Sequence, residues 1–134
     1  MQNPKIETLN SKQVQNPNAP NTKVYDLDER TETFARACRV LIKQSPRTIA
    51  GIEDGKQLAR SSGSVAANYI EASEAVSQKD FYFRIKICRK EAKESRLWLR
   101  LMDVEGDLSS QRDQLVHEVT ELMRIFGAII KKVG

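Results

Sequence analysis

The chain has 134 residues, of which 30% are charged and 40% hydrophobic, with only 6 glycines and 4 prolines; this is the size of one domain. Aromatic residues make up 6%, and the sequence lacks alternating runs of Val, Ile and Thr, so its composition favours helices over an all-β sandwich. The longest apolar stretch, residues 126–130, is too short to span a membrane, and the first ten residues lack the apolar block of a signal peptide. We therefore expect a soluble, cytoplasmic protein.

The residues that usually carry metal or catalytic chemistry are scarce. Two cysteines, Cys38 and Cys88, and one histidine, His117, are too few for a zinc site built from Cys and His. Both cysteines fall on apolar helical stripes, which indicates buried, reduced side chains, with a disulfide as the alternative. Di-iron bundles need Glu-x-x-His pairs, but Gln114 takes the place of that glutamate before His117. Residues 51–57 lack the spacing of a phosphate loop. We expect no catalytic residue, metal or cofactor, and we predict that the protein is not an enzyme.

Residues 1–25 hold three of the four prolines and five asparagines, with no helical or strand period. This composition is typical of a flexible tail. The tail has three lysines against one glutamate, a net charge of +2, which leaves +2 of the chain's total of +4 for the rest. The folded domain is therefore expected to span residues 26–134.

Two helices are expected in the first half of this domain. The first begins in the capping region 26–28 and ends at about Gln44, because the Ser-Pro pair at 45–46 stops it. The second begins between residues 48 and 53 and runs to about Val76 with one periodic face. Small residues dominate that face, so a neighbouring helix can approach closely. These residues are Ser62, Gly63, Ala66, Ala72 and Ser73.

Two further helices are expected in the second half. Residues 77–80 (Ser-x-x-Asp) have the form of a capping box and open a third helix that runs to about Val104. Residues 110–113, again Ser-x-x-Asp, open a fourth helix that runs to Lys132. Four helices of this length with short connections predict an all-α protein, an antiparallel up-down four-helix bundle.

The third and fourth helices carry more apolar surface than one bundle needs. Additional apolar rows lie beside their main stripes on a helical wheel. These rows indicate either a wide core face or a subunit interface, and we favour the interface because Trp98 stands beside glutamates, as in mixed interfaces. The candidate interface residues are Ile87, Trp98, Leu101, Val116, Met123 and Ile130.

Basic residues are concentrated on one side of the third helix. Between residues 79 and 102 there are eight basic and three acidic residues, a net charge of +5. Seven of the basic residues fall within about 120° of one another on a helical wheel. Such a run is either a solvated face or, when repeated in an oligomer, a site for polyanions. The candidate nucleic-acid-binding residues are Lys79, Lys86, Arg89, Lys90, Lys93, Arg96 and Arg100.

Three segments together carry a family resemblance: SVAANYIEA at 64–72, the helix start at 77–81, and KEAKESRLWLRLM at 90–102. They resemble the bacterial four-helix-bundle family whose first described members are encoded in intervening sequences of large-subunit ribosomal RNA genes. That family is related to the accessory variability proteins of diversity-generating retroelements. The resemblance covers about residues 25–133, and this chain has Ala72 where many members have glycine.

The resemblance implies a homopentamer of four-helix bundles with no established enzymatic activity. In the retroelement relatives it also implies a basic surface that binds nucleic acid and a reverse transcriptase. The most specific motifs are Asn-x-x-Glu at 68–71 and Glu-Ser-x-x-Trp-Leu at 94–99. From the residues themselves we expect a polar network that sets helix register, in which Asn68 bridges to a glutamate across the bundle, with a ligand site as the alternative. The members of this candidate network are Asn68, Glu71, Glu91 and Glu94.

Two functions remain open from the sequence. The first is a non-enzymatic, oligomeric protein that binds structured RNA or DNA through the basic face, as an accessory factor to an RNA or reverse-transcriptase system. The second is a structural or protein-interaction scaffold whose basic face is only solvated. Neither function involves a membrane.

Overall fold

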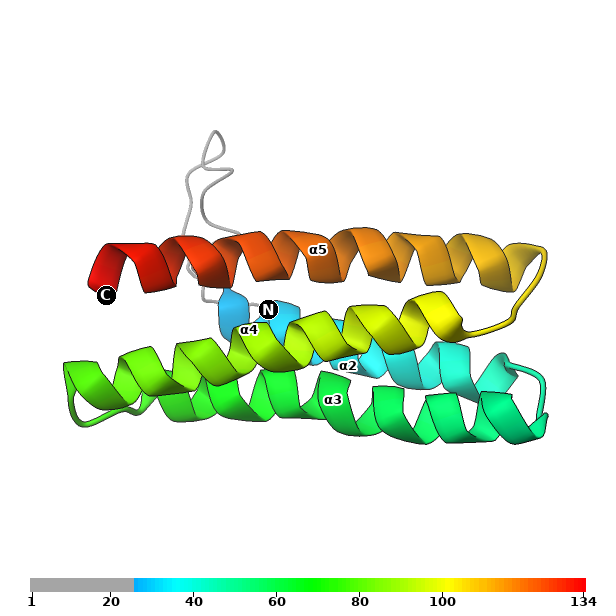
Figure 1. Ribbon diagram of the computed structural model, residues 1–134, viewed down its shortest axis with the longest axis horizontal. Helices are drawn as coiled ribbons and strands as arrows, with labels where there is room; N and C mark the ends of the chain where they lie inside the picture. The colour runs from blue at the N-terminus through cyan, green and yellow to red at the C-terminus, as the bar shows by residue number, and fades with distance from the viewer. Residues whose placement is uncertain (1–25) are drawn as a thin grey trace. The chain divides into compact units, whose positions relative to one another are not determined.

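The structure, a computed structural model, describes residues 26–134, and within them it contains four α-helices and no strand (Figure 1). Helix α2 spans Leu27–Gln44, α3 spans Ile49–Ser73, α4 spans Gln78–Leu101 and α5 spans Asp107–Val133. The predicted all-α class with four packed helices is confirmed. The predicted tail, 1–25, lies outside the described residues. None of the four helices has the length and hydropathy that crossing a membrane requires.

The first two helices begin near the predicted positions. Helix α2 ends at Gln44, directly before the Ser-Pro pair. The side chain of Thr48 caps α3, because its Oγ1 accepts a hydrogen bond from the backbone N–H of Gly51 at 3.0 Å. The expected end of this helix at Val76 is wrong. Helix α3 stops at Ser73, where the backbone N–H of Glu74 turns back to the carbonyls of Ile70 and Ala72, and Val76 is 95% exposed.

The start of α4 agrees with the start predicted from the sequence, whereas the start of α5 does not. Ser77 Oγ accepts the backbone N–H of Asp80 at 3.0 Å, which confirms the predicted cap. Helix α4 ends at Leu101 rather than at about Val104. Helix α5 begins at Asp107 and not after residue 110, because Gly106 adopts a φ of +59° and turns the chain directly into the helix without a side-chain cap.

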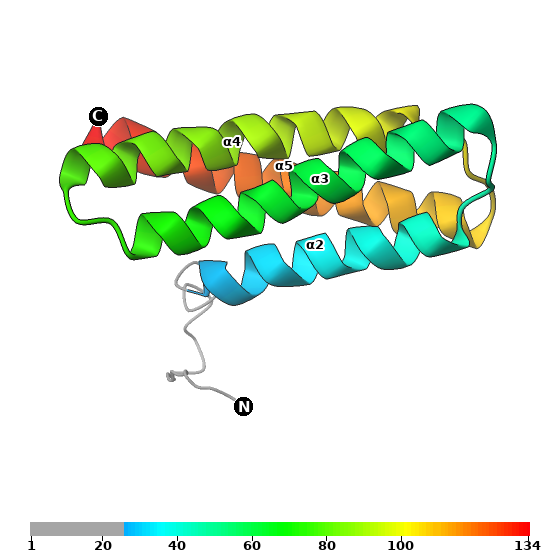
Figure 2. The ribbon, with the colours of Figure 1, turned by 90° about the horizontal axis from the view of Figure 1, so that it is seen from below.

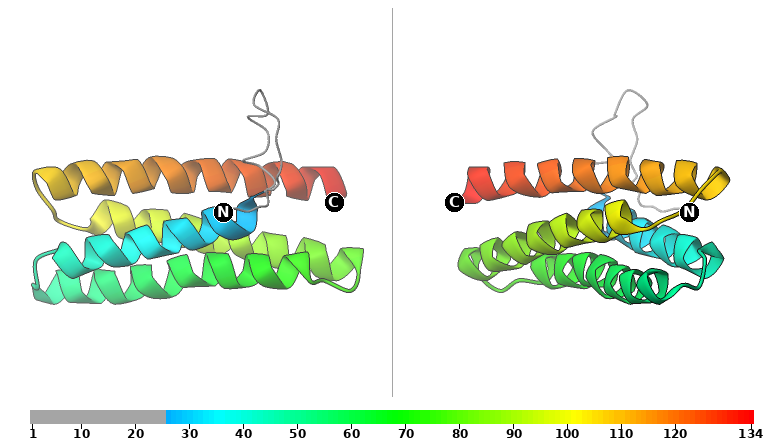
Figure 3. Two further views of the ribbon diagram at one scale, coloured as in Figure 1. Left: turned by 180° about the vertical axis from the view of Figure 1, so that it is seen from behind. Right: turned by 45° about the vertical axis from the view of Figure 1, so that its right-hand side comes forward.

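The packing described below is that of the compact unit Thr31–Gly134. Within it α4 lies between α3 and α5 and packs along both, and α2 lies beside α3 (Figures 2 and 3). Apolar residues that recur every three or four positions along each helix supply the core. Fully buried members include Phe34, Cys38, Leu41, Leu58, Val65, Ile85, Cys88, Leu99, Val119, Leu122 and Phe126.

Two glycines of α3 lie against side chains of α2. A Cβ atom added at Gly55 would lie 3.1 Å from Cγ2 of Ile42 on α2, and one added at Gly63 would lie 3.1 Å from Nη2 of Arg39. The Arg39 guanidinium crosses from α2 and donates to the backbone carbonyl of Ala59 at 3.1 Å. Of the predicted small-residue face, Gly63 lies beside the Arg39 guanidinium of α2, so at this position the face receives a long side chain of α2.

Candidate functional site

The predicted basic residues of α4 lie largely at the surface. Arg96 is half-buried and the other six are exposed. Two of them reach toward α5: Arg96 Nη1 donates to Thr120 Oγ1 at 3.4 Å, and Arg89 Nε lies 3.6 Å from the position that a Cβ at Gly127 would occupy. Arg89 Nε therefore lies near Gly127 on α5. Arg89 and Arg96 therefore lie on the side of α4 that borders α5.

Four of these basic residues line a surface hollow of about 400 Å³. One apolar residue, Ile130, enters it from α5. Lys86 is held over an aromatic ring, since its Nζ lies 5.2 Å from the ring centroid of Tyr82. The hollow is therefore a concave surface with clustered positive charge. We call it the basic hollow, and its lining residues are Lys86, Arg89, Lys90, Lys93, Glu94 and Ile130.

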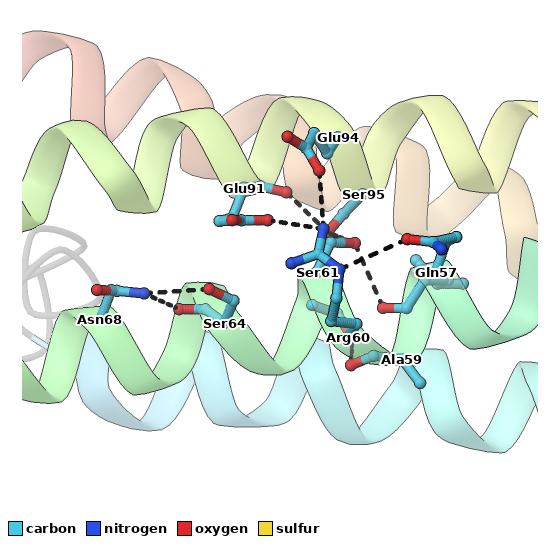
Figure 4. A network of polar contacts seen from close by, with 11 residues as sticks. Gln57, Ala59, Arg60, Ser61, Ser64, Asn68, Glu91, Glu94 and Ser95 are labelled. Carbon is cyan, nitrogen blue, oxygen red and sulfur yellow. Dashed lines mark hydrogen bonds and ion pairs between the residues drawn. The ribbon is translucent and has the colours of Figure 1, made fainter.

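Arg60 on α3 joins two glutamates of α4, as Figure 4 shows. Its Nη2 lies 3.2 Å from Oε1 of Glu91 and 2.8 Å from Oε1 of Glu94. The Glu91 side chain is only 10% exposed, whereas that of Glu94 is 40% exposed. The hydrogen bond to Glu91 is the main cause that raises the pKa of Arg60 above its ordinary value. The predicted network thus contains Glu91 and Glu94, and Arg60 is the member that sequence reasoning missed.

Asn68 lies in a different set of contacts. Its Nδ2 donates to the backbone carbonyl of Ser64 at 2.9 Å, and its Oδ1 accepts from Arg84 Nη1 on α4 at 3.1 Å. Asn68 therefore reaches α4 through an arginine rather than through Glu91 or Glu94, in contrast to the bridge expected from the sequence. Glu71, also placed in the network by its spacing, is exposed at the surface of α3. Asn68 thus contacts α4 through Arg84, whereas Glu71 is exposed.

The predicted interface rows are mostly half-buried within the chain, and only Leu101, at 53%, is exposed. Their burial within one chain leaves both predicted readings, a wide core face and a subunit interface, as predictions. Trp98 Nε1 is buried and has no hydrogen-bond partner within residues 26–134. Phe83 and Leu97, 54% and 47% exposed, lie on the outer side of α4 and were missed because they fall outside the rows selected from the sequence.

The two cysteines and the histidine lie in different surroundings. Cys38 and Cys88 are buried free thiols, and burial raises the pKa of each from 9.0 to about 12. A thiol in such surroundings is a weak nucleophile. His117 is exposed. Within residues 26–134 no group of three or more His, Cys, Asp or Glu side chains is placed to hold a metal ion.

Comparison with known proteins agrees with the four-helix arrangement. Residues 24–128 match the family described as 23S rRNA-intervening sequence protein. The chain is also similar to a crystal structure of a protein of unknown function from the S23 ribosomal protein family of Bacteroides thetaiotaomicron VPI-5482. That match has 28% sequence identity and a TM-score of 0.67, and it covers 78% of this chain and 97% of the other. No curated protein matches this chain.

Proposed function

Because this chain belongs to the 23S rRNA-intervening sequence protein family, we propose that it is a non-enzymatic protein that binds structured RNA or DNA through the basic face of α4. The observation that carries the proposal is the basic hollow, in which four exposed lysine and arginine side chains surround a concavity of about 400 Å³. Lysine supplies point charges and arginine supplies planar forks, and phosphate oxygens accept hydrogen bonds from both.

The chemistry of the basic face favours phosphate contacts over base readout. Phosphate contacts position a protein on a nucleic acid, whereas sequence is read at base edges or by stacking on aromatic rings. The residues that line the basic hollow supply four cations, one carboxylate and one isoleucine, but no aromatic ring. We therefore expect binding with little sequence preference and a logarithmic salt slope of about −0.9 per phosphate contact on duplex DNA.

The proposal includes assembly. We propose that the antiparallel up-down bundle forms a homo-oligomer in the cytoplasm, a pentamer by resemblance to its relatives, with a reverse transcriptase as a further partner. Exposed apolar side chains on α4 support assembly, since Phe83, Leu97 and Leu101 are each about half exposed. Repetition of the basic face around a ring would strengthen its field.

Charge reversal on α4 tests the binding function. The triple variant Lys86→Glu, Lys93→Glu and Arg100→Glu should weaken binding to a structured RNA by more than about tenfold at 0.1 M salt. The measurement is fluorescence anisotropy at several salt concentrations. The matched control is the triple variant Lys43→Glu, Arg47→Glu and Lys56→Glu, which changes the net charge equally at exposed positions of α2, the following loop and α3.

The two variants separate the proposal from a general effect of charge. Circular dichroism and sedimentation should show unchanged helicity and assembly for both, since all six side chains are exposed. Equal loss of binding in both variants would mean that only net charge matters. Tight binding by the α4 variant would favour the second candidate function, a protein-interaction scaffold, for which the exposed Phe83 and Leu97 are the supporting observation.

Assembly is tested by sedimentation of the parent protein and of Trp98→Ala. We expect a closed oligomer for the parent and weaker assembly for the variant. The control is a substitution of Val40, an exposed residue of α2, which should leave assembly unchanged. Because oligomer and fold can be linked, the helical signal is measured at each concentration. A parent protein that is monomeric at micromolar concentration would refute this part of the proposal.

A further inference from the structure

We infer that the basic hollow holds phosphate groups and that Arg60 on α3 is a positioning residue, which keeps the Glu94 carboxylate from cancelling the charge of the hollow. The inference rests on the proposed function and deepens it, because it assigns a role to a residue outside α4. Arg60 is not among the residues that line the hollow. Its effect on a bound phosphate would therefore be exerted through Glu94.

Glu94 is the one acid among the residues that line the hollow. A carboxylate at this place opposes phosphate binding in two ways. It repels the phosphate, and it can pair with Lys90, one helical turn away, and so occupy a cation that the phosphate needs. Arg60 prevents both, since its Nη2 lies 2.8 Å from Oε1 of Glu94. The pair leaves the four cations of the hollow without a competing acid.

The position of Arg60 is itself fixed from the interior. Its Nη2 also lies 3.2 Å from Oε1 of Glu91, whose side chain is 10% exposed, so one guanidinium group joins a nearly buried carboxylate and a surface carboxylate (Figure 4). Buried carboxylates keep their partners because an unpaired buried charge is costly. Glu91 thus anchors Arg60, and Arg60 in turn holds Glu94. The contact links α3 to the basic face of α4.

A double-mutant cycle tests this role. The four proteins are the parent, Arg60→Gln, Glu94→Gln and the double variant, and the probes are a short duplex RNA and long-chain inorganic polyphosphate. Arg60→Gln should weaken binding about twofold to fivefold, the range that one exposed ion pair contributes. In the Glu94→Gln background, Arg60→Gln should have no effect on binding, because residue 94 no longer carries a carboxylate that the loss of Arg60 could leave unpaired. An equal loss in both backgrounds would mean that Arg60 contacts the ligand directly, and no loss in either would also overturn the inference.

Controls separate positioning from charge and from folding. Arg36→Gln removes one positive charge from an exposed ion pair with Glu32 on α2, at 2.8 Å, and should leave binding unchanged. Arg60→Lys keeps the charge and should restore most of the binding. Urea unfolding is measured for every variant, and binding is compared only where each protein is folded. A change in stability alone would not produce a loss that depends on the residue at 94.

The two probes separate this inference from the proposed function. Binding to polyphosphate without binding to RNA would refute the proposed function, while the cycle on polyphosphate would still report on Arg60. Binding to RNA with equal losses in both backgrounds would refute the inference and leave the proposed function intact. A parent protein that bound neither probe would overturn both, because the basic hollow would then not be an anion site.

Discussion

The hydroxyl oxygens of Ser61 on α3 and Ser95 on α4 lie 2.8 Å apart, and both side chains are fully buried. Ser95 Oγ also lies 2.9 Å from the backbone carbonyl oxygen of Glu91. Two small residues at facing positions let α3 and α4 approach closely, and their hydroxyl groups are satisfied by each other and by the backbone. This contact lies beside the salt bridges of Arg60, so the packing of the two helices determines where Arg60 meets the basic face.

A larger side chain at this contact should separate the helices. Ser95→Leu is expected to lower the free energy of unfolding by about 1–3 kcal/mol, because overpacking displaces its neighbours. Ser95→Ala should cost about 0.5–1.5 kcal/mol, since it removes one hydrogen bond and leaves the Ser61 hydroxyl with a poorer partner. Urea denaturation followed by circular dichroism measures both. Ser110→Leu, at an exposed position of α5, is the control and should change stability little; a similar loss there would contradict the packing argument.

Much of the fold could be predicted because helical periodicity records which positions are buried. On α4 and α5 the fully buried apolar residues, which include Ile85, Cys88, Leu99, Val119, Leu122 and Phe126, recur at helical spacing. The start of α5 could not be predicted in this way. A Ser-x-x-Asp pattern at 110–113 is a common signal for a helix start. The helix begins earlier, however, at a turn in which Gly106 has a positive φ. Because glycine has no side chain to cap the helix, the sequence contains no capping motif at this position.

The candidate site was predictable only in part, for a related reason. A helical wheel predicts that the basic residues of α4 share one side, because their relative directions depend on the geometry of one helix alone. The partners of Asn68 and of the glutamates depend on which turn of α3 faces which turn of α4. That register is set by the packing of side chains. Arg60 and Asn68 lie eight residues apart on α3, so a displacement of about two helical turns would exchange them as partners of Glu91. A single sequence contains no direct signal for it.

The capping assignments allow a comparison between two Ser-x-x-Asp motifs. Ser77→Ala should lower the free energy of unfolding by about 1 kcal/mol, because Ser77 Oγ accepts the N–H of Asp80 at the start of α4. Ser110→Ala should have almost no effect, since Ser110 lies inside the first turn of α5 and is exposed. Thermal or urea unfolding of the two variants checks this prediction. A loss of stability for Ser110→Ala as large as that for Ser77→Ala would contradict a start of α5 at Asp107.

Two helical glycines should respond in opposite directions to replacement by alanine. A Cβ at Gly51 would lie 2.7 Å from the backbone carbonyl oxygen of Pro46, which cannot move freely, so Gly51→Ala should destabilise the fold by about 1–3 kcal/mol. A Cβ at Gly127 would meet Arg89 Nε at 3.6 Å, an ordinary contact. Gly127→Ala should therefore stabilise α5 by about 0.5–1 kcal/mol through helix propensity. Urea midpoints that moved in the same direction for both variants would contradict the space described around Gly51 and Gly127.

The buried thiols predict how stability depends on alkaline pH. Burial raises the pKa of Cys38 and of Cys88 from 9.0 to about 12. Below pH 9 both thiols are protonated in the folded and unfolded states, and they add no pH dependence. Above pH 9 the unfolded chain releases protons that the folded chain retains, so stability is lost as the pH rises toward 12, by about 1.4 kcal/mol per pH unit for each thiol.

A variant isolates this effect from the lysines and tyrosines that titrate over the same range. Cys88→Ala should be less stable than the parent at neutral pH, because it leaves a cavity beside Val65, whose carbonyl oxygen lies 3.6 Å from Cys88 Sγ. Above pH 9 its free energy of unfolding should fall less steeply than that of the parent, so the two curves converge by about 1.4 kcal/mol per pH unit. Urea titrations at a series of pH values measure the difference. Curves that stayed parallel would mean that the Cys88 thiol ionises as readily in the folded protein as in the unfolded chain.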